Sequence, residues 1–288
     1  MTKRRELARR MASMTDIGEL LGAMKNLALV ESQRIAAFIE AQRLVASIVR
    51  DALADVLRHH GEDLLPPARD AEHHAQVLCV IGSERGFCGD LNQRLIDAAR
   101  GAITTASSPP AVVLVGQRLI DAWDAGATKA DASIVGAGFA DEADAVLARL
   151  LAALAARLAP SARRGSPRVD LLHMAEGGVR SVRVLPADLP PGAAAPPSHS
   201  VALNLPAVTL YAELLGQYLE TGIGTALYDA LLYENQARLA YLEQARQRID
   251  ERLIALGRLA NRARQEEITE EIEIILLSGQ VEADNPAR

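Results

Sequence analysis

A glycine-rich loop holds the residues best placed to do chemistry. The segment IGSERGFCGDLNQRL (81–95) follows an apolar run and opens a helical pattern, with glycines at 82, 86 and 89. Glycines between a strand and a helix can bring backbone N–H groups close to a phosphate. The spacing here is G-x-x-x-G-x-x-G, which is not the dinucleotide fingerprint, and no Lys–Ser/Thr pair follows as in a P-loop. Because Glu84 and Asp90 would repel a phosphate, we interpret the loop as a tight structural turn with Asp90 as the helix N-cap.

The other reactive side chains form no catalytic or metal-binding pattern. Ser83 does not lie in a G-x-S-x-G elbow, and His173 could act as a base at a strand end but has no paired nucleophile. The two cysteines, Cys79 and Cys88, are not a C-x-x-C pair, so we expect reduced, packed thiols rather than a regulatory disulfide. Two adjacent histidine pairs lack Cys or Asp partners at ligand spacing. We therefore predict no catalytic residue, no metal and no cofactor.

The elements that must position this loop begin with a long helix at residues 1–60. This segment contains no proline and repeats apolar side chains every seven residues, which is typical of a helix with a narrow apolar stripe. The stripe consists of Leu7, Met14, Leu21, Ala28 and Ile35, and Ile17, Met24 and Phe38 fill most of a second seam. The basic start, MTKRRELARR, is either a solvated helix end or a contact for an acidic partner.

The middle segment, residues 75–206, alternates short apolar runs with helical patterns. The runs 76–82, 111–116 and 132–135 read as strands, and EGG separates two more strands at 168–174 and 179–186 as in a hairpin. Strands alternating with helices indicate a parallel sheet. The segment is therefore predicted to be one small α/β domain.

The last segment, residues 207–280, is predicted to be a second long helix. Its heptad is strong from Leu232 to Ala263, and the apolar stripe then slips by one residue to Ile268, Ile272 and Ile275. Two long helices with narrow stripes, joined by a compact domain, pair most simply as an antiparallel coiled coil. We expect the end of the second helix to extend past its partner.

Composition narrows the function classes. The chain has 288 residues and a net charge of −6, which disfavours general nucleic-acid binding. Aromatic residues make up only 3%, and Ala, Leu, Arg and Glu dominate, as in long helices and coiled coils. No window of about 18 apolar residues is long enough to span a membrane, and no apolar signal core follows the basic start. We expect a cytoplasmic protein.

Three stretches resemble the gamma subunit of F-type ATP synthases. Residues 261–279 resemble its C-terminal signature N-x-A-R-Q-x-x-I-T-x-E-[LI]-x-E-I, and YENQARLAYL (233–242) resembles its E-x-x-A-R-M-x-A-M block. SERGFCGDLN (83–92) resembles the D-R-G-L-C-G-x-L-N motif. The matching signature residues are Asn261, Ala263, Arg264, Gln265, Ile268, Thr269 and Glu271. The residues of the other two stretches that we expect to be structural are Arg85, Gly86, Cys88, Gly89, Asn92, Asn235 and Arg238.

The resemblance implies a fold and a function. The fold is an antiparallel coiled coil of the terminal helices with a central Rossmann-like α/β domain. The function is that of a central rotor shaft, which couples rotation of the membrane c ring to ATP synthesis or hydrolysis at the beta subunits without doing chemistry itself. The implied partners are three alpha and three beta subunits, the epsilon subunit and the c ring, at the cytoplasmic face of the membrane. Arg264, Gln265, Thr269, Met24 and Lys25 would contact beta, with Arg264 and Gln265 engaging an acidic loop.

The N-terminal helix departs from the family pattern. Typical members continue A-M-x-x-V-A-A-S-K-M-R-K, whereas this chain has AMKNLALVESQRIA, which lacks the basic run and introduces Glu31. The departure suggests a divergent member, such as the shaft of a second ATPase operon. Because the ion ligands of the family lie in the c ring, this chain carries no information on the coupling ion.

Two other function classes compete with the shaft. A dinucleotide-binding enzyme with helical arms would need a different loop at 82–89. A static coiled-coil scaffold would not predict the C-terminal signature.

Overall fold

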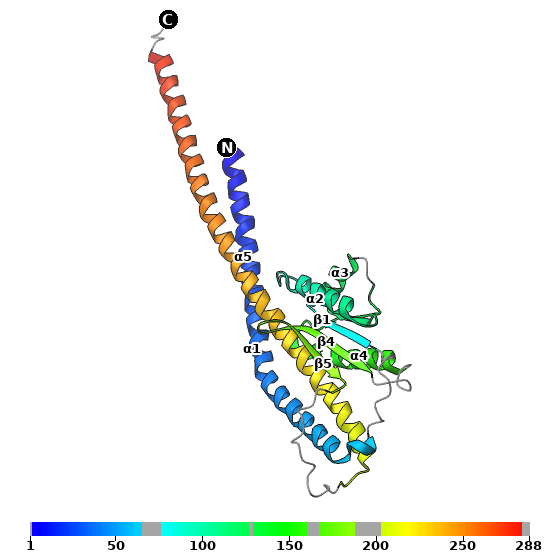
Figure 1. The fold of residues 1–288 in the computed structure, drawn as a ribbon. Coiled ribbons are helices and arrows are strands. Elements are labelled where there is room, and N and C mark those ends of the chain that lie inside the picture. Colours follow the sequence, from blue (N-terminus) through cyan, green and yellow to red (C-terminus); the bar gives the residue numbers. More distant parts are fainter. Residues whose placement is uncertain (1, 65–75, 127–128, 160–166, 188–202, 284–288) are drawn as a thin grey trace. The chain divides into compact units, whose positions relative to one another are not determined.

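The computed structural model describes residues 2–64, 76–126, 129–159, 167–187 and 203–283. The chain divides into two compact units, one of Ala28–Arg238 and one of Met1–Leu27 with Leu239–Arg288. Two long helices contribute to both units: α1, Thr2–Leu64, and α5, Ala207–Ala283 (Figure 1). Their lengths agree with the long terminal helices predicted from the seven-residue repeats.

The unit Ala28–Arg238 is built on a five-stranded sheet with the order β3-β2-β1-β4-β5. The first four strands run parallel, and β5 pairs antiparallel with β4 across a turn at Glu176 and Gly177. The predicted strands and the predicted hairpin are therefore confirmed. The strand bounds are β1 Gln76–Ile81, β2 Ala111–Val115, β3 Ala132–Ile134, β4 Arg168–Ala175 and β5 Gly178–Leu185.

Helices cover both faces of this sheet. On one face lie α2, Leu91–Thr105, and α3, Gln117–Asp124. On the other lie α4, Ala143–Leu158, which follows the short helix η2, Ala140–Glu142, and a stretch of α5. Figure 1 shows α2 and α3 on the opposite side of the sheet from α4.

Alternation along the central strand explains why two cores form. In β1, Val77, Cys79 and Ile81 pack toward α4 and α5, while Leu78 and Val80 pack toward α2 and α3. Successive strand side chains point to opposite faces, so a strand covered on both sides must be apolar throughout. This requirement accounts for the uninterrupted apolar runs in the sequence.

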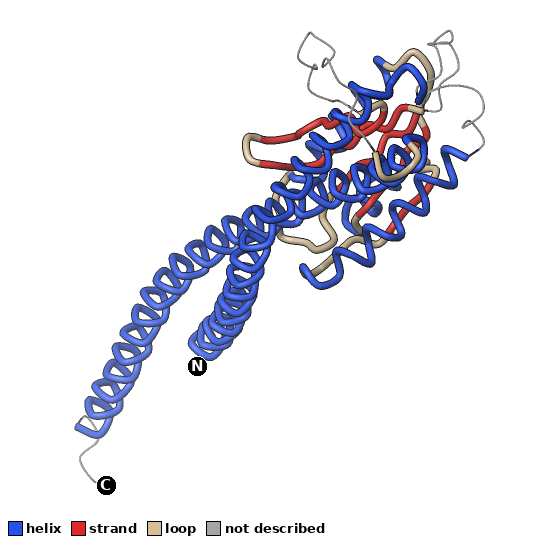
Figure 2. The backbone as a smooth tube through the Cα atoms, turned by 90° about the horizontal axis from the view of Figure 1, so that it is seen from below, coloured by secondary structure: helices blue, strands red, loops and turns tan. Residues whose placement is uncertain are grey.

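The second unit consists of the start of α1 and the end of α5, paired antiparallel. Arg4 forms an ion pair with Glu267, and Lys25 forms one with Glu243, so residue numbers rise along one helix as they fall along the other. Figure 2 shows the start of α1 and the end of α5 at the same end of this pair. At least one arginine of the basic start, Arg4, thus makes a contact within the chain.

The first predicted seam of α1 is confirmed, but the second is wrong. Leu21, Ala28 and Ile35 are buried, whereas Ile17 and Phe38 are 45% and 56% exposed. The second buried or half-buried row follows the first by four residues instead of three. It consists of Met11, Gly18, Lys25, Ser32 and Ile39. On α1 alone, the positions three and four residues after the first row border the apolar stripe equally well, so the sequence of α1 does not distinguish them. Gly18 lies close to α5, since a Cβ there would be 3.6 Å from a side-chain carbon of Ile249.

The apolar stripe at the end of α5 is exposed. Ile268, Ile272 and Ile275 are 45%, 52% and 67% exposed. Glu267, which pairs with Arg4, is close to the first residue of α1. As expected from the sequence, α5 extends beyond the start of α1.

Gly116 offers a direct test of the junction between β2 and α3. Its φ is +111°, and a Cβ there would lie 2.7 Å from the carbonyl oxygen of Gly82 and 2.8 Å from that of Ser83. Because both neighbours are backbone atoms, we expect Gly116→Ala to lower the free energy of unfolding by about 2–4 kcal/mol. Urea unfolding of the full chain measures this change.

Gly101 provides the matched control. It lies within α2, and a Cβ there would meet nothing within 4 Å. Gly101→Ala should raise the free energy of unfolding by roughly 0.5–1 kcal/mol, since alanine is the better helix former. Equal stabilities for the two variants would contradict the close approach at Gly116.

Candidate functional site

The glycine-rich loop begins where β1 ends, at a special place in the sheet. The strand order reverses between β1 and β4, because β2 and β3 lie on one side of β1 and β4 on the other. In doubly wound folds, ligands bind at the carboxyl ends of the strands beside such a reversal. The groups around the loop show whether this crevice is open to a ligand.

Glu234 of α5 reaches into the loop and takes two of its backbone donors. The carboxylate accepts hydrogen bonds from the N–H of Glu84 and the N–H of Arg85, both at 3.1 Å. It also forms an ion pair with Arg238, one turn further along α5. Glu234 and Arg238 are only 4% and 5% exposed. We name this arrangement of Glu234, Arg238 and the two N–H groups the clasp.

Arg238 ties the clasp to further parts of the predicted motifs. Its Nε donates to the carbonyl of Gly86 at 3.1 Å, and its Nη1 donates to Oδ1 of Asn235 at 2.8 Å. Asn235 in turn donates to the carbonyl of Leu231 at 2.9 Å. The structure thus brings together Gly86, Asn235 and Arg238, three residues that sequence similarity marked as structural.

Glu234 itself was missing from the predicted site residues. It opens the same E-x-x-A-R block and lies four residues before Arg238, the spacing at which opposite charges meet on a helix. This spacing is the feature of the sequence that could have identified Glu234 as a partner of Arg238. Burial raises the pKa of Glu234, while Arg238 and the two backbone N–H groups oppose the rise. The charged form of the Glu234 carboxylate is therefore stabilised by Arg238 and by the two backbone N–H groups together.

Glu84 fills the position that a bound anion would take. Its Oε2 accepts hydrogen bonds from the N–H of Gln117 at 2.8 Å and the N–H of Gly136 at 2.7 Å. Gln117 is the first residue of α3, and a helix N-terminus attracts negative charge. The N–H groups that could hold a phosphate are thus engaged by the protein's own carboxylate.

The remaining motif residues shape the loop. Asn92 accepts from the N–H of Ser83 at 3.0 Å and donates to its hydroxyl at 2.8 Å. The guanidinium of Arg85 lies 3.9 Å from the centre of the Phe139 ring, a cation–π distance. Gly89 has a φ of +62°, a left-handed conformation that glycine adopts readily. Arg85 and Asn92 thus make contacts within the α/β unit, and Gly89 adopts a backbone conformation that suits the turn.

The predicted N-cap is correct in place but wrong in its hydrogen bond. Asp90 precedes the first residue of α2, yet its side chain makes no capping hydrogen bond, and its φ and ψ are −91° and 10°. A capping residue normally has extended backbone, which aims its oxygen at the first free N–H groups. The backbone conformation at Asp90 does not allow this.

Both cysteines are free and buried, as predicted. Burial raises the pKa of the Cys79 thiol to about 12 and that of the Cys88 thiol to about 11. The sulfur of Cys88 lies 3.3 Å from the carbonyl oxygen of Gly86 and 3.6 Å from Nη2 of Arg238. Cys88 thus packs against the clasp as a thiol.

The five residues expected to contact the beta subunit do not form one cluster. Arg264, Gln265 and Thr269 are exposed on α5, and Thr269 donates to the carbonyl of Gln265 at 2.9 Å. Met24 and Lys25 are half-buried on α1, and Lys25 is paired with Glu243. Since Glu243 and Arg264 are 21 positions apart on one helix, the two groups are about 30 Å apart along α5.

Glu31, the departure from the family pattern, has a contact within the chain. It is 7% exposed, and its carboxylate accepts from the N–H of Ala140 at 3.4 Å. Three residues on, Arg34 forms an ion pair with Asp141 at 2.9 Å. The altered stretch of α1 therefore contacts η2 of the same unit.

No group of three or more His, Cys, Asp or Glu side chains in the described ranges is placed to hold a metal ion. Among the helices that the structure describes, none is both long enough and apolar enough to cross a membrane.

Comparisons with known proteins extend over nearly the whole chain. The sequence profile of the family described as ATP synthase matches residues 3–279. An ATP synthase gamma chain from Desulforamulus reducens is 28% identical over 280 residues, which cover 96% of this chain and 98% of that protein. A gamma chain from Saccharopolyspora erythraea is 28% identical over 314 residues and covers 98% of each chain.

Solved structures show the same fold. A chain in the Euglena gracilis mitochondrial ATP synthase (OSCP, F1 and c-ring) aligns with a TM-score of 0.63 at 15% identity. The alignment covers 100% of this chain and 97% of that one. A chain of the Tetrahymena thermophila central stalk and c-ring aligns with a TM-score of 0.56 at 15% identity, over 78% of this chain and 99% of that one.

Removing one partner of the clasp should be strongly destabilising. Arg238→Met leaves the buried carboxylate of Glu234 without its cation, so we expect the free energy of unfolding to fall by about 3–5 kcal/mol. The exposed pair Arg262–Glu266 has the same spacing on the same helix. Arg262→Met should change stability by no more than about 0.5 kcal/mol. Urea unfolding of both variants compares the two losses, and equal losses would show that burial is irrelevant.

Neither thiol should react in the folded chain. Because only the thiolate is nucleophilic and both thiols have raised pKa values, we expect negligible alkylation by iodoacetamide at about pH 8. Unfolding in urea at the same pH should make both cysteines react. Mass spectrometry counts the modified cysteines, and rapid labelling of the folded chain at Cys88 would contradict the packing described.

Proposed function

The chain belongs to the ATP synthase family as a gamma chain, the central shaft of the rotor, and we propose that it transmits torque without doing chemistry itself. Its partners are the alpha and beta subunits and the c ring. As a gamma chain it couples rotation of the c ring to ATP synthesis or hydrolysis at the beta subunits. The assignment agrees with a family match from residue 3 to residue 279.

The observation that carries the torque proposal is the clasp. It joins the loop after β1 to α5 by contacts between residues about 150 positions apart in the sequence. A buried pair of charges with fixed hydrogen bonds resists sliding, because any displacement leaves a charge unpaired away from water. The clasp therefore couples rotation of the α/β domain to α5.

The filled crevice supports a non-catalytic role. Glu84 and Glu234 together engage four backbone N–H groups at and around the glycine-rich loop. A nucleotide would have to displace two carboxylates and overcome their charge. We propose that this crevice serves as a joint between α5 and the sheet instead of a ligand site.

The beta contact is proposed to lie at Arg264 and Gln265. Both are exposed, and Arg264 makes no ion pair with any residue whose position is described. An unpaired guanidinium can make bidentate hydrogen bonds to a carboxylate of a partner. Thr269, one turn further on, extends this surface, whereas Met24 and Lys25 would form a separate contact about 30 Å away.

The composition of the chain favours a rotating shaft over a statically bound scaffold. A shaft turning in a bearing must make contacts that differ between rotor angles, and none of them can be too tight. The low aromatic content of 3% limits strong anchoring contacts. The alternative of a static scaffold is not favoured, because it explains neither the C-terminal signature nor the family match.

The arrangement in the cell is proposed from family membership. The chain would be organised as residues 1–60 and 207–280 in the coiled coil and residues 75–206 in the central domain. The central domain would dock on the epsilon subunit and the c ring, as a peripheral component at the cytoplasmic face of the membrane.

Co-expression with the alpha and beta subunits of the same organism tests the shaft. Size-exclusion chromatography should give a complex with one copy of this chain for every three beta subunits, with higher ATPase activity than the alpha–beta complex alone. A chain that elutes by itself from every such mixture would contradict the proposal.

The beta contact is tested by the double substitution Arg264→Ala with Gln265→Ala. We expect the ATPase activity of the assembled complex to fall about ten-fold, since two polar contacts to beta are lost. Circular dichroism of the isolated chain should not change, because both side chains are exposed. The control is Gln247→Ala with Arg248→Ala, the same residue types exposed on the same helix but outside the signature. Undiminished turnover in the first variant would refute the assigned role.

A further inference from the structure

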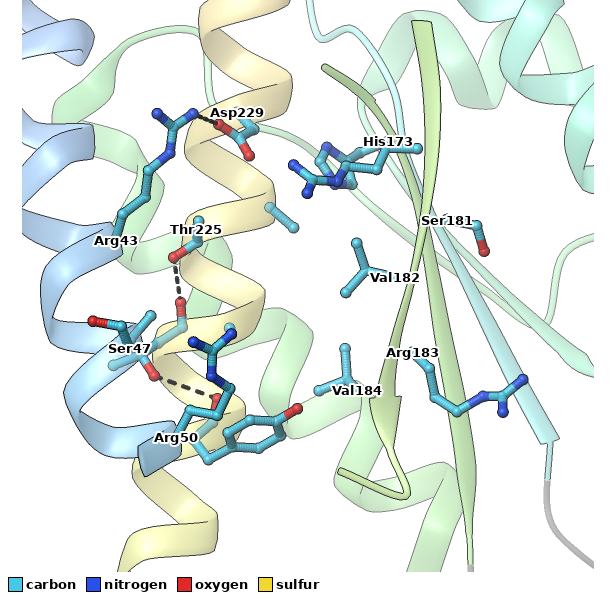
Figure 3. A pocket seen from close by; sticks show the side chains of 16 residues that line it. Arg43, Ser47, Arg50, His173, Ser181, Val182, Arg183, Val184, Thr225 and Asp229 are labelled. Atoms are coloured by element: carbon cyan, nitrogen blue, oxygen red, sulfur yellow. Dashed lines mark hydrogen bonds and ion pairs between the residues drawn. The ribbon is translucent and has the colours of Figure 1, made fainter. Parts of the chain in front are cut away.

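A cavity of about 600 Å³ lies within the unit Ala28–Arg238, between α1, α5 and strand β5. Figure 3 shows α1 and α5 on one side of it and the strands on the other. Val182 and Val184 of β5 point toward the helices and, with Ala226 of α5, give the cavity an apolar wall. The volume is typical of a small-molecule site.

The charges around this cavity are unbalanced. Arg43, Arg50 and Arg180 line it, while Asp229 is the one carboxylate among its described lining residues. Arg43 donates to Asp229 at 2.7 Å, which neutralises that pair. The ion pair of Arg50 is with its neighbour Asp51 at 3.8 Å, and Arg180 has no ion pair with a described residue. Arg180 is therefore left with donors for an anion near His173, while Arg50 lies at the other end of the cavity (Figure 3).

A fourth arginine, Arg183, borders the cavity but does not serve it. Its side chain points away from the helices in Figure 3. Its Nε donates to Asp170 at 3.1 Å, and Asp170 also pairs with Arg168. Alternation along β5 therefore separates Arg180 from Arg183, although they are only three positions apart.

A buried histidine forms part of the cavity wall. His173 is 1% exposed, and its Nδ1 lies 3.2 Å from the carbonyl oxygen of Met174. Because a carbonyl only accepts, Nδ1 carries the hydrogen, and Nε2 of the neutral ring is free to take up a proton. Burial lowers the pKa of His173, the nearby Arg180 lowers it further, and the Met174 carbonyl and Asp229 oppose this. The imidazole is neutral at pH 7 and can become a donor when negative charge enters.

We propose that this cavity binds an organic phosphate, with Arg180 on the phosphate at the His173 end and the apolar wall of Val182, Val184 and Ala226 against the organic part. Guanidinium groups match the geometry of phosphate oxygens and hold them by bidentate hydrogen bonds. A phosphate ion alone would leave most of the volume empty, whereas a nucleotide or a phospholipid headgroup would fill it. A concave site with an imidazole in its wall suits a small anion better than a flat acidic protein surface. This inference does not depend on the shaft function.

Binding to the isolated full chain tests the site. ADP and short-chain dihexanoyl phosphatidylglycerol are titrated separately by calorimetry, and the imidazole signals of the six histidines are followed by NMR. Saturable binding of either probe, with a rise in the pKa of His173 alone, is the expected result. Tighter binding of ADP identifies a free nucleotide-like anion, and tighter binding of the lipid identifies a headgroup.

Matched arginine variants separate a built site from general attraction. Arg180→Gln should weaken binding about ten-fold, because it removes charge-assisted hydrogen bonds to the phosphate, whereas Arg50→Gln, at the other end of the cavity, should weaken it less. Arg183→Gln, on the same strand as Arg180 but facing Asp170, should change the affinity less than two-fold. Equal weakening by all three variants would mean non-specific attraction and would overturn the proposal.

Two further outcomes would also overturn it. One is the absence of saturable binding of both probes to the folded wild-type chain. The other is a loss of assembly with the partner subunits in Arg50→Gln and Arg180→Gln without any anion binding, which would assign these arginines to a protein interface. Neither outcome would change the evidence for the shaft.

Discussion

The structure of the α/β unit depends on one buried pair of charges, Glu234 and Arg238. Removing two such groups from water costs several kcal/mol for each, and their mutual attraction offsets this only when the remaining hydrogen bonds are also made. Here the backbone N–H groups of Glu84 and Arg85, the carbonyl of Gly86 and the amide of Asn235 complete the set. The loop after β1 and helix α5 must therefore keep one relative position for these hydrogen bonds to form.

This requirement explains how a nucleotide-binding type of sheet can serve as a mechanical part. The strand order reverses at β1, where related folds bind ligands, and the loop there has glycines as in a ligand site. Two carboxylates of the protein replace the ligand. Glu84 lies at the start of α3, and Glu234 holds the loop from α5. The same backbone donors that favour anion binding here join a helix to a sheet.

The sequence predicted the elements better than their contacts. Strands buried on both faces must be apolar throughout, so β1 and β2 could be predicted from their apolar runs. The seven-residue repeat predicted both long helices. The second seam of α1 was misassigned because positions three and four residues after the first seam look alike until α5 is in place. Glu234 was missed because its burial depends on a loop about 150 residues away, which local spacing does not reveal.

The end of α5 raises a different physical question, since several of its described apolar side chains are largely exposed to solvent. Ile268, Ile272 and Leu276 are 45%, 52% and 64% exposed, beyond the ion pair of Arg4 with Glu267. An isolated helix of about 12–15 residues is only marginally stable in water, and exposed isoleucine adds no stabilising burial. A surrounding ring of subunits would cover this stripe. Isoleucine and leucine give non-directional contacts, which change less with rotor angle than hydrogen bonds do. On the proposed beta contact, Arg264 and Gln265 would supply the directional contacts, and the apolar side chains further along the same helix would supply contacts that depend less on rotor angle.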